Sequence, residues 1–337
     1  MEQTSSRLVR HISFKRQGVF LMMLFALFGF LLAITQILGE SPDYSDYNDF
    51  FDLVRSEGIE VLAVSRFEPG FSILALVLTK LFTTNVIVYG WIVVAAMLFK
   101  GWAINAYSSS QWIFFVVAAF YFSRYFPLHE LTQLRAACAI ALILSGAVFL
   151  WKGNLVIGAL LCALSLLFHM SAAAVIPALL LVVSQRSRVI LIACVIFIFT
   201  SAFSGILTGY LGNFISMVDS YQTSGFGKDI PNPFAVQLLI DWTMIAISLV
   251  MWDRLSLLMK RIVLLELIGM GVFYGVNEFA VVAHRIREFY SVFWVLFVAD
   301  GLRQKDTKLL TYGFVLTCII FYFYIFVFSK NFFNLNI

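Results

Sequence analysis

The sequence has few charged residues, and this excludes a soluble protein. Only 12% of its 337 residues are Asp, Glu, Lys or Arg, whereas 61% are hydrophobic and the mean hydropathy is +0.93. A soluble domain normally has about 25% charged residues. So small a polar fraction cannot cover the surface of a water-soluble fold of this length. No polar segment is long enough to form a soluble catalytic domain, so any chemistry must come from helix ends and loops.

Cysteine is also scarce, and its placement excludes two kinds of site. The sequence has four Cys residues, all inside apolar runs and without a Cys-x-x-Cys pair. They are typical of small buried hydrophobic side chains and not of disulfides or a zinc site. Phosphate-binding loops of the Walker or Gly-x-Gly-x-x-Gly kind are absent, as is an Asp-x-Asp loop placed to hold a metal. We therefore expect no metal, no cofactor and no nucleic-acid partner.

What the sequence does contain is a series of apolar runs. They lie near 18–38, 69–83, 86–106, 111–126, 131–151, 154–183, 189–209, 234–252, 262–280, 283–300 and 309–328. Because a spanning helix needs about 20 apolar residues, we predict an all-α, polytopic integral membrane protein with about 11 transmembrane helices (about 10–12). These form one transmembrane domain over residues 1–337. The 154–183 run is long enough to be tilted or broken near Pro177.

The basic residues predict an orientation for these runs. They gather before the first run and again after residues 183, 252 and 300. If every run crosses once, all four clusters lie in the cytoplasm, as the positive-inside rule requires. The loops near 39–68 and 210–233 are then extracytoplasmic. The same count places Arg135 near the cytoplasmic side.

The richest group of ionisable residues near membrane depth is His284, Arg285, Arg287 and Glu288. A charge at that depth costs roughly 2.5–3.5 kcal/mol, so such residues usually face a partner or a cavity. On a helix His284 and Glu288 share a face, with the two arginines beside them. Two guanidiniums followed by Tyr290 suit phosphate groups. The alternative is a short extracytoplasmic turn whose charges meet water.

Other ionisable residues inside apolar runs have two interpretations each. Arg135 is either a cytoplasmic flank or a side chain that points inward. His169 is either functional or hydrogen-bonded to a neighbouring helix. Asp241, Glu266 and Glu278 are either site residues or the ion-pair partners of arginines.

Tyrosines alternate with aspartates in the first predicted loop. Tyr44 and Tyr47 follow Asp43 and Asp46. Aromatic rings beside carboxylates suit the faces and hydroxyl groups of sugars, but an amphipathic helix at the membrane interface has the same pattern.

Several short elements occur in a fixed order along nearly the whole chain. They are an Asp/Tyr-rich stretch from Pro42 to Tyr47, Glu-Pro-Gly-Phe from Glu68 to Phe71, Gln133-Leu134-Arg135, His169-Met170-Ser171 followed by Pro177, and Arg285-Ile286 followed by Phe289-Tyr290. In this order the chain resembles the EpsG/Wzy type of polysaccharide polymerase. These are integral membrane proteins of capsule, exopolysaccharide and O-antigen assembly.

The resemblance implies an activity at the outer face of the bacterial cytoplasmic membrane. A growing glycan would move from undecaprenyl diphosphate onto a lipid-linked oligosaccharide repeat unit. Arg285, with Arg287 and Arg135, would stabilise the leaving diphosphate. Glu68, His169 or Glu288 would accept the proton of the attacking hydroxyl. A flippase and a chain-length regulator are the implied protein partners.

We therefore expect Arg285, Glu68 and His169 to be catalytic. The expected substrate-binding residues are Arg287, Arg135, Asp43, Tyr44, Tyr47, His284, Glu288 and Tyr290.

Two other activities fit the same composition. A lipid-linked glycan flippase or transporter would explain intramembrane charges, but such chains usually show repeated halves, which this sequence lacks. A membrane O-acyltransferase acting on surface polysaccharide would need a His–acid pair in an early helix, and His11 lies in a basic tail without one.

Overall fold

The structure is a computed structural model that describes residues 16–36, 43–183, 190–195, 197–198, 232, 235–276 and 279–327. Within these ranges every regular element is a helix and no strand occurs, which confirms the all-α prediction. Four described helices are long and apolar enough to cross a membrane on their own: Gln17–Thr35, Asn85–Asn105, Leu134–Trp151 and Lys308–Phe326. The larger number of spans stays a prediction. The predicted loop at 210–233 lies almost wholly outside the described residues.

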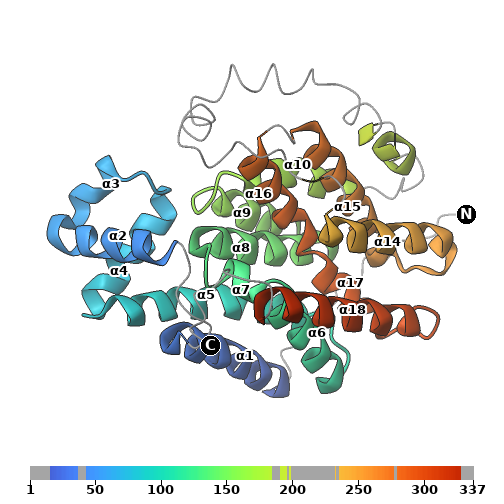
Figure 1. The fold of residues 1–337 in the computed structure, drawn as a ribbon, viewed down its shortest axis with the longest axis horizontal. Helices are drawn as coiled ribbons and strands as arrows, with labels where there is room; N and C mark the ends of the chain where they lie inside the picture. The colour runs from blue at the N-terminus through green and yellow to red at the C-terminus, as the bar shows by residue number, and fades with distance from the viewer. Residues whose placement is uncertain are drawn as a thin grey trace, which may run out of the picture.

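Figure 1 shows how the described helices are arranged. In chain order they are α1 (Arg16–Thr35), α2 (Tyr44–Glu57), the 3-10 turn η1 (Gly58–Glu60), α3 (Val61–Val64), α4 (Pro69–Leu81), α5 (Asn85–Asn105), α6 (Gln111–Arg124), α7 (Phe126–His129), α8 (Leu134–Trp151), α9 (Leu155–Ser165), α10 (Ala172–Val183), α14 (Val236–Val250), the 3-10 turn η2 (Trp252–Arg254), α15 (Leu257–Gly275), α16 (Ala280–Ser291), α17 (Trp294–Gly301) and α18 (Lys308–Val327).

Glycines bring the helices of the bundle close together. A Cβ atom on Gly90 of α5 would lie 2.7 Å from the Ile34 side chain at the end of α1. Near the other end of α5, a Cβ atom on Gly101 would lie 3.2 Å from Phe25. The two helices are therefore antiparallel and in contact over most of their length. Small residues at such interfaces are how apolar helices pack inside a membrane.

Polar contacts fix the direction of α8 and α9. Ser145 of α8 donates to the Phe99 carbonyl (3.2 Å), and Lys152, just after α8, donates to the Ala106 carbonyl (3.3 Å), so α8 runs parallel to α5. A Cβ atom on Gly158 of α9 would lie 2.9 Å from the Gly146 carbonyl oxygen, which packs α9 back along α8. The start of α8 and the end of α9 therefore lie at the same end of the bundle.

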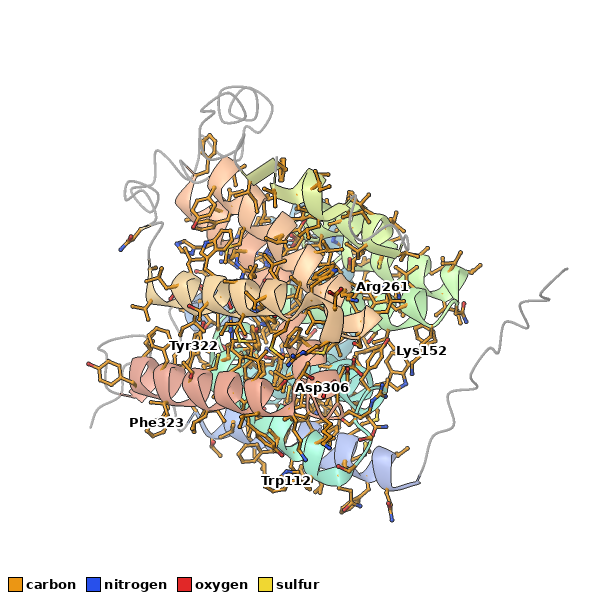
Figure 2. The ribbon with its side chains drawn as sticks, turned by 90° about the vertical axis from the view of Figure 1, so that its right-hand side faces the viewer. Trp112, Lys152, Arg261, Asp306, Tyr322 and Phe323 are labelled. Atoms are coloured by element: carbon orange, nitrogen blue, oxygen red, sulfur yellow. The ribbon has the colours of Figure 1, made fainter. Side chains whose placement is uncertain are left out.

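Two basic residues, Lys152 and Arg261, lie at the same end of the bundle. Figure 2 shows Lys152 and Arg261 toward one end, and Tyr322 and Phe323 of α18 toward the other. Arg261 donates to the carbonyl of Val183 (3.1 Å), so α10 also finishes at the basic end. By the positive-inside rule we expect this end to be the cytoplasmic one, and this orientation stays a prediction.

Two of the predicted apolar runs are interrupted helices. The 283–300 run breaks between α16 and α17, whereas the separate runs 111–126 and 131–151 correspond to α6 and α8, with the short α7 between them. The 154–183 run breaks at 166–171. The expectation of a break near Pro177 is wrong, because Pro177 lies inside α10. A proline in the second turn of a helix removes only one backbone hydrogen bond, and this helix continues past it.

The segment between α1 and α5 forms a separate group of helices, α2 to α4, at the left of Figure 1. Its interior is aromatic. The ring centres of Phe50 and Phe67 lie 4.5 Å apart, with the rings edge to face, and those of Tyr47 and Phe71 lie 5.7 Å apart. Because α2 buries Tyr47, Phe50, Phe51 and Val54 on one face, it is an amphipathic helix. The stretch thus forms an amphipathic helix, while its place at the membrane interface and its binding of sugars stay predictions.

Candidate functional site

Two predicted site residues from separate motifs form an ion pair. Arg135, at the start of α8, lies 2.6 Å from the Oε2 atom of Glu68, the residue that precedes α4. Both side chains are largely buried, with 22% and 14% of their surface exposed. The guanidinium also interacts electrostatically with Tyr47 and lies over the Phe67 ring, 4.6 Å from its centre. Arg135 is thus held in place from three sides.

The Glu-Pro-Gly-Phe element folds as a helix start docked on a helix break. Pro69 occupies the first turn of α4, where its missing N–H costs nothing. The Gly70 N–H donates to the Leu167 carbonyl in the break after α9 (2.8 Å). A Cβ atom on Gly70 would lie 2.7 Å from that oxygen, so only glycine permits the approach. Glu68 then accepts the Met170 N–H (3.4 Å), which brings it beside His169.

The contact between Arg135 and Glu68 corrects the predicted topology. Counting one crossing per run places Glu68 outside and Arg135 near the cytoplasmic side, yet the two side chains touch. An even number of crossings must therefore separate them. We propose that the run at 69–83 does not cross, because α4 has only 13 residues and the carbonyl of Phe82, just after it, accepts from Arg55 of α2. Arg135 therefore lies at the end away from Lys152 and Arg261.

Arg285 faces the same region from the second half of the chain. Its guanidinium lies 4.0 Å from the Asp43 carboxylate, and 27% of its side-chain surface is exposed. The charges of Arg285 and Arg135 both act on Asp43, Tyr47 and His169. The structure thus brings together Asp43, Glu68, Arg135, His169 and Arg285, which lie far apart in the sequence.

Asp43 is the most accessible carboxylate of this group, with 38% of its side-chain surface exposed. Partial burial raises its pKa above the usual value, and the positive charge of Arg285 opposes that rise. Its neighbour Asp46 raises the pKa further. A carboxylate with a raised pKa is a better proton acceptor than an ordinary aspartate.

His169 lies in the break between α9 and α10. Its Nδ1 atom accepts the Ser171 N–H (3.1 Å), so in the neutral ring the proton resides on Nε2. The ring also packs against Phe289 of α16, with 5.5 Å between ring centres. In this arrangement Nε2 is a hydrogen-bond donor, which suits a phosphate oxygen or a sugar oxygen.

Glu288 is half-buried near two residues that the motifs did not single out as site residues, Gln133 and His129. Its carboxylate interacts electrostatically with Gln133, Arg285 and Asp43. His129 lies at the end of α7, four residues before Gln133, and is fully buried and stacked on Tyr125. Neither of its ring nitrogens has a hydrogen-bond partner among the described residues. The only sequence signal for both is their position in a polar stretch after a proline that interrupts an apolar run.

Arg287 points away from Arg285, although the sequence predicts that both guanidiniums bind the same phosphate groups. It lies 2.7 Å from Asp241 of α14 and 2.7 Å from Glu266 of α15, and only 6% of its side chain is exposed. Arg124 also pairs with Asp241, at 2.6 Å. The ion-pair interpretation of Asp241 and Glu266 is therefore correct. Glu278 lies outside the described residues.

The remaining predicted binding residues mainly pack against neighbouring helices. Tyr290 donates to the Ala174 carbonyl of α10 (2.6 Å), and Tyr44 packs against Tyr89 (5.4 Å between ring centres). His284 lies edge to face with Phe273, 5.7 Å between ring centres. These contacts fix α2, α10, α15 and α16 around the site.

A polar pocket of about 230 Å³ adjoins the site between α6, α14, α16 and α18. The pocket is lined by the last turns of α18 and by polar side chains, which are His129, His284, Glu288 and the ion-paired Arg124 and Arg287. Its arginines are neutralised by Asp241 and Glu266, so it suits uncharged polar groups better than a diphosphate. Among the described residues, no group of three or more His, Cys, Asp or Glu side chains is arranged to hold a metal ion.

Comparison with known proteins places the chain in one family. No curated protein and no solved structure matches it. The sequence model of the EpsG family matches residues 20–337, and this range contains every residue of the candidate site. The chain therefore belongs to the EpsG family, the EpsG/Wzy type of polysaccharide polymerase.

Proposed function

We propose that this membrane protein is a lipid-linked oligosaccharide polymerase. A hydroxyl group at the non-reducing end of a new repeat unit attacks the anomeric carbon of a growing glycan held on undecaprenyl diphosphate. The new glycosidic bond forms as the bond from carbon to phosphate oxygen breaks. The hydroxyl proton passes to a base, and undecaprenyl diphosphate leaves with the bonding electron pair. The reaction takes place at the extracytoplasmic face.

The observation that carries this proposal is that Arg135 and Arg285 lie near the same group of residues. Two guanidiniums from the two halves of the chain act on one set of groups. Glu68 largely neutralises Arg135, whereas Arg285 has only a loose contact with Asp43. Arg285 is therefore the cation available for the leaving diphosphate, and Arg135 adds positive potential behind it. Such fixed charges stabilise a leaving anion without having to reorient during the reaction.

The other site residues take different parts in the proton transfer. Glu68 is paired with Arg135 and His169 has its Nδ1 atom occupied, so neither is placed to accept a proton. Asp43 is accessible and has a raised pKa, so we assign it the general base. The His169 Nε2–H then donates to a substrate oxygen. Glu68 is a positioning residue that holds Arg135.

The lipid-linked glycans of a strain lacking this protein test the proposal. A missing polymerase leaves single repeat units on the outer face of the membrane. A missing flippase leaves none there, and a missing O-acyltransferase leaves polymer of full length. Restoration of the ladder of polymer lengths by the wild-type gene, but not by the Arg285→Ala variant, is the expected result. A full ladder in the deletion strain would contradict the proposal.

A further inference from the structure

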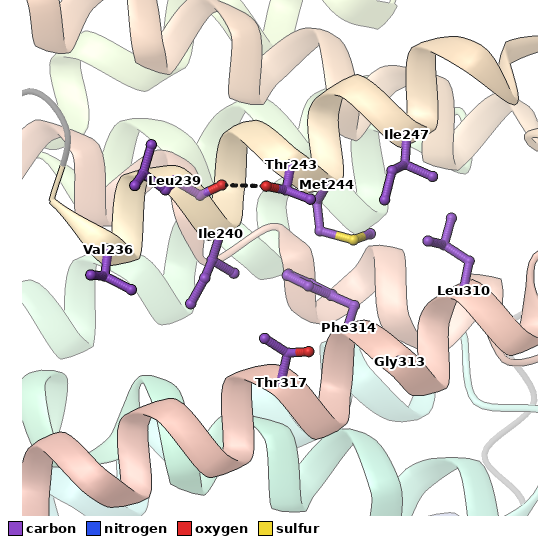
Figure 3. Close-up of a pocket in the computed structure, with 10 residues that line it drawn as sticks. All are labelled: Val236, Leu239, Ile240, Thr243, Met244, Ile247, Leu310, Gly313, Phe314 and Thr317. Atoms are coloured by element: carbon purple, nitrogen blue, oxygen red, sulfur yellow. Dashed lines mark hydrogen bonds between the residues drawn. The ribbon is translucent and has the colours of Figure 1, made fainter.

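An apolar groove runs between α14 and α18 and has a volume of about 380 Å³. Figure 3 shows its walls: residues of α14 on one side and of α18 on the other, with space between them. The apolar side chains on these walls include Leu239, Ile240, Met244, Ile247, Leu310 and Phe314. An apolar cavity of about 150 Å³ is already large enough to bind benzene. This groove is large enough for a stretch of hydrocarbon chain.

The groove offers no free polar group on its α14 side. The hydroxyl of Thr243 donates to the Leu239 carbonyl of its own helix (2.7 Å), as the dashed line in Figure 3 shows. Gly313 adds open space on the α18 side, since a Cβ atom there would meet no atom within 4 Å. α18 is long and apolar enough to span a membrane, and α14 is a shorter apolar helix. A hydrocarbon ligand therefore fits the groove better than a sugar or a phosphate.

The same two helices also line the polar pocket beside the candidate site. Leu238 and Asp241 of α14 face the polar pocket, whereas their neighbours Leu239 and Ile240 face the groove. Glu288 of α16 lines the polar pocket, and its carboxylate interacts electrostatically with Arg285, which links the pocket to the candidate site. The apolar groove, the polar pocket and the candidate site with Arg285 therefore lie next to one another in this order. A molecule with a long hydrocarbon tail and a charged, sugar-bearing head has the same order of chemistry.

We propose that the groove between α14 and α18 holds the isoprenoid chain of the lipid-linked substrate, with the diphosphate toward Arg285. The inference rests on the proposed function for the identity of the substrate. Bulk phospholipid is the competing occupant. A phospholipid has two chains and no requirement for the adjoining cationic site, so competition experiments separate the two.

Photolabelling tests the occupant without requiring turnover. The probe is an isoprenyl diphosphate with a photoreactive group at the end of its tail, added to the purified protein in lipid nanodiscs. We expect labelled peptides from α14 and α18, with labelling reduced at least tenfold by undecaprenyl diphosphate but not by phosphatidylglycerol. Labelling spread over other lipid-facing helices, or equal competition by phosphatidylglycerol, would overturn the proposal. Because no transfer is needed, this result is independent of whether the protein polymerises glycans.

Filling the groove provides the second test. Gly313→Phe places a ring in open space, and Leu316→Phe adds a similar ring on the exposed face of α18 as a matched control. We expect Gly313→Phe to reduce probe labelling and turnover of the long-chain repeat unit at least tenfold. Turnover of an analogue with a short tail should be unchanged, and Leu316→Phe should match wild type. Unchanged labelling in Gly313→Phe, or an equal loss in both variants, would contradict the assignment.

Discussion

Arg135 and Glu68 are partners across the site: an arginine that opens α8 lies 2.6 Å from a glutamate that precedes α4. Each belongs to a different motif, and the sequence predicts a catalytic role for Glu68 and a substrate-binding role for Arg135. The pair leaves Glu68 poorly placed as a base and makes it the residue that orients Arg135. The following experiments separate these roles.

A double-mutant cycle distinguishes positioning from proton transfer. Glu68→Gln should lower polymer formation about tenfold or more, because Arg135 loses its carboxylate partner. The double variant Glu68→Gln/Arg135→Ala should then be no worse than Arg135→Ala, since interacting residues are not additive. The measurement is polymer formed per molecule of inserted protein. Multiplying losses in the double variant would instead indicate that Glu68 acts independently, as a base would.

Arg285 should matter for the rate and little for folding. A planar guanidinium matches two phosphate oxygens, whereas a lysine provides only a point charge. Arg285→Lys should keep substrate binding but lose much of the rate, and Arg285→Ala should lose both, by on the order of 10²–10³ in rate. Stability in detergent should stay near wild type, because the side chain is partly exposed and loosely paired. Normal specific activity in both variants would exclude a role with the diphosphate.

Arg287 should show the opposite behaviour. Arg287→Ala leaves the buried carboxylates of Asp241 and Glu266 without one of their cations, which typically costs on the order of 3–5 kcal/mol. We expect a lower melting temperature in detergent and less inserted protein, with normal activity per remaining molecule. A stable but inactive Arg287→Ala protein would show that this residue acts directly on substrate.

The acidic limb of the pH profile reports the proposed base. Turnover requires ionised Asp43, so the rate should fall as pH drops through its raised pKa. The negative charge of Asp46 contributes to that rise, so Asp46→Asn should lower the pKa and move the acidic limb to lower pH. Asp43→Asn should lose most of the activity at every pH. An unmoved limb in Asp46→Asn would indicate that another group accepts the proton.

Cysteine labelling tests the side on which the site lies. Ser45→Cys, in α2, should react with an impermeant maleimide in intact cells. Ser109→Cys, in the turn between α5 and α6, should react only after lysis. The four natural cysteines should add little background labelling in the folded protein, because all four are buried. Labelling of Ser109→Cys alone in intact cells would invert the proposed orientation.

Sequence alone predicted several residues that the structure brings together in the candidate site. The short motifs placed Glu68, Arg135, His169 and Arg285 on the list of candidates, and the hydropathy predicted a helical membrane protein. The number of crossings before Arg135 could not be read in the same way. Hydropathy detects the apolar residues of α4 but cannot show that they pack against α2. A short helix inside an aromatic cluster is therefore predicted to be a membrane span.

Partner choice was also beyond sequence. Arg285 and Arg287 are two positions apart, which turns their side chains about 200° from each other on a helix. Only the positions of α2, α14 and α15 decide that one meets Asp43 while the other is enclosed by Asp241 and Glu266. His129 carries no motif, and its burial without a partner is visible only once the neighbouring helices are in place.

The docking of Gly70 on the break after α9 has a consequence for biogenesis. A broken helix within a bilayer leaves backbone groups that lipid cannot satisfy. Here the Leu167 carbonyl and the Met170 N–H find their partners on a segment made about a hundred residues earlier. Because that segment leaves the ribosome first, its helix start is available when the hairpin of α9 and α10 arrives. We therefore predict that a circular permutant that delivers α4 last inserts this hairpin before its partners exist and yields less folded protein.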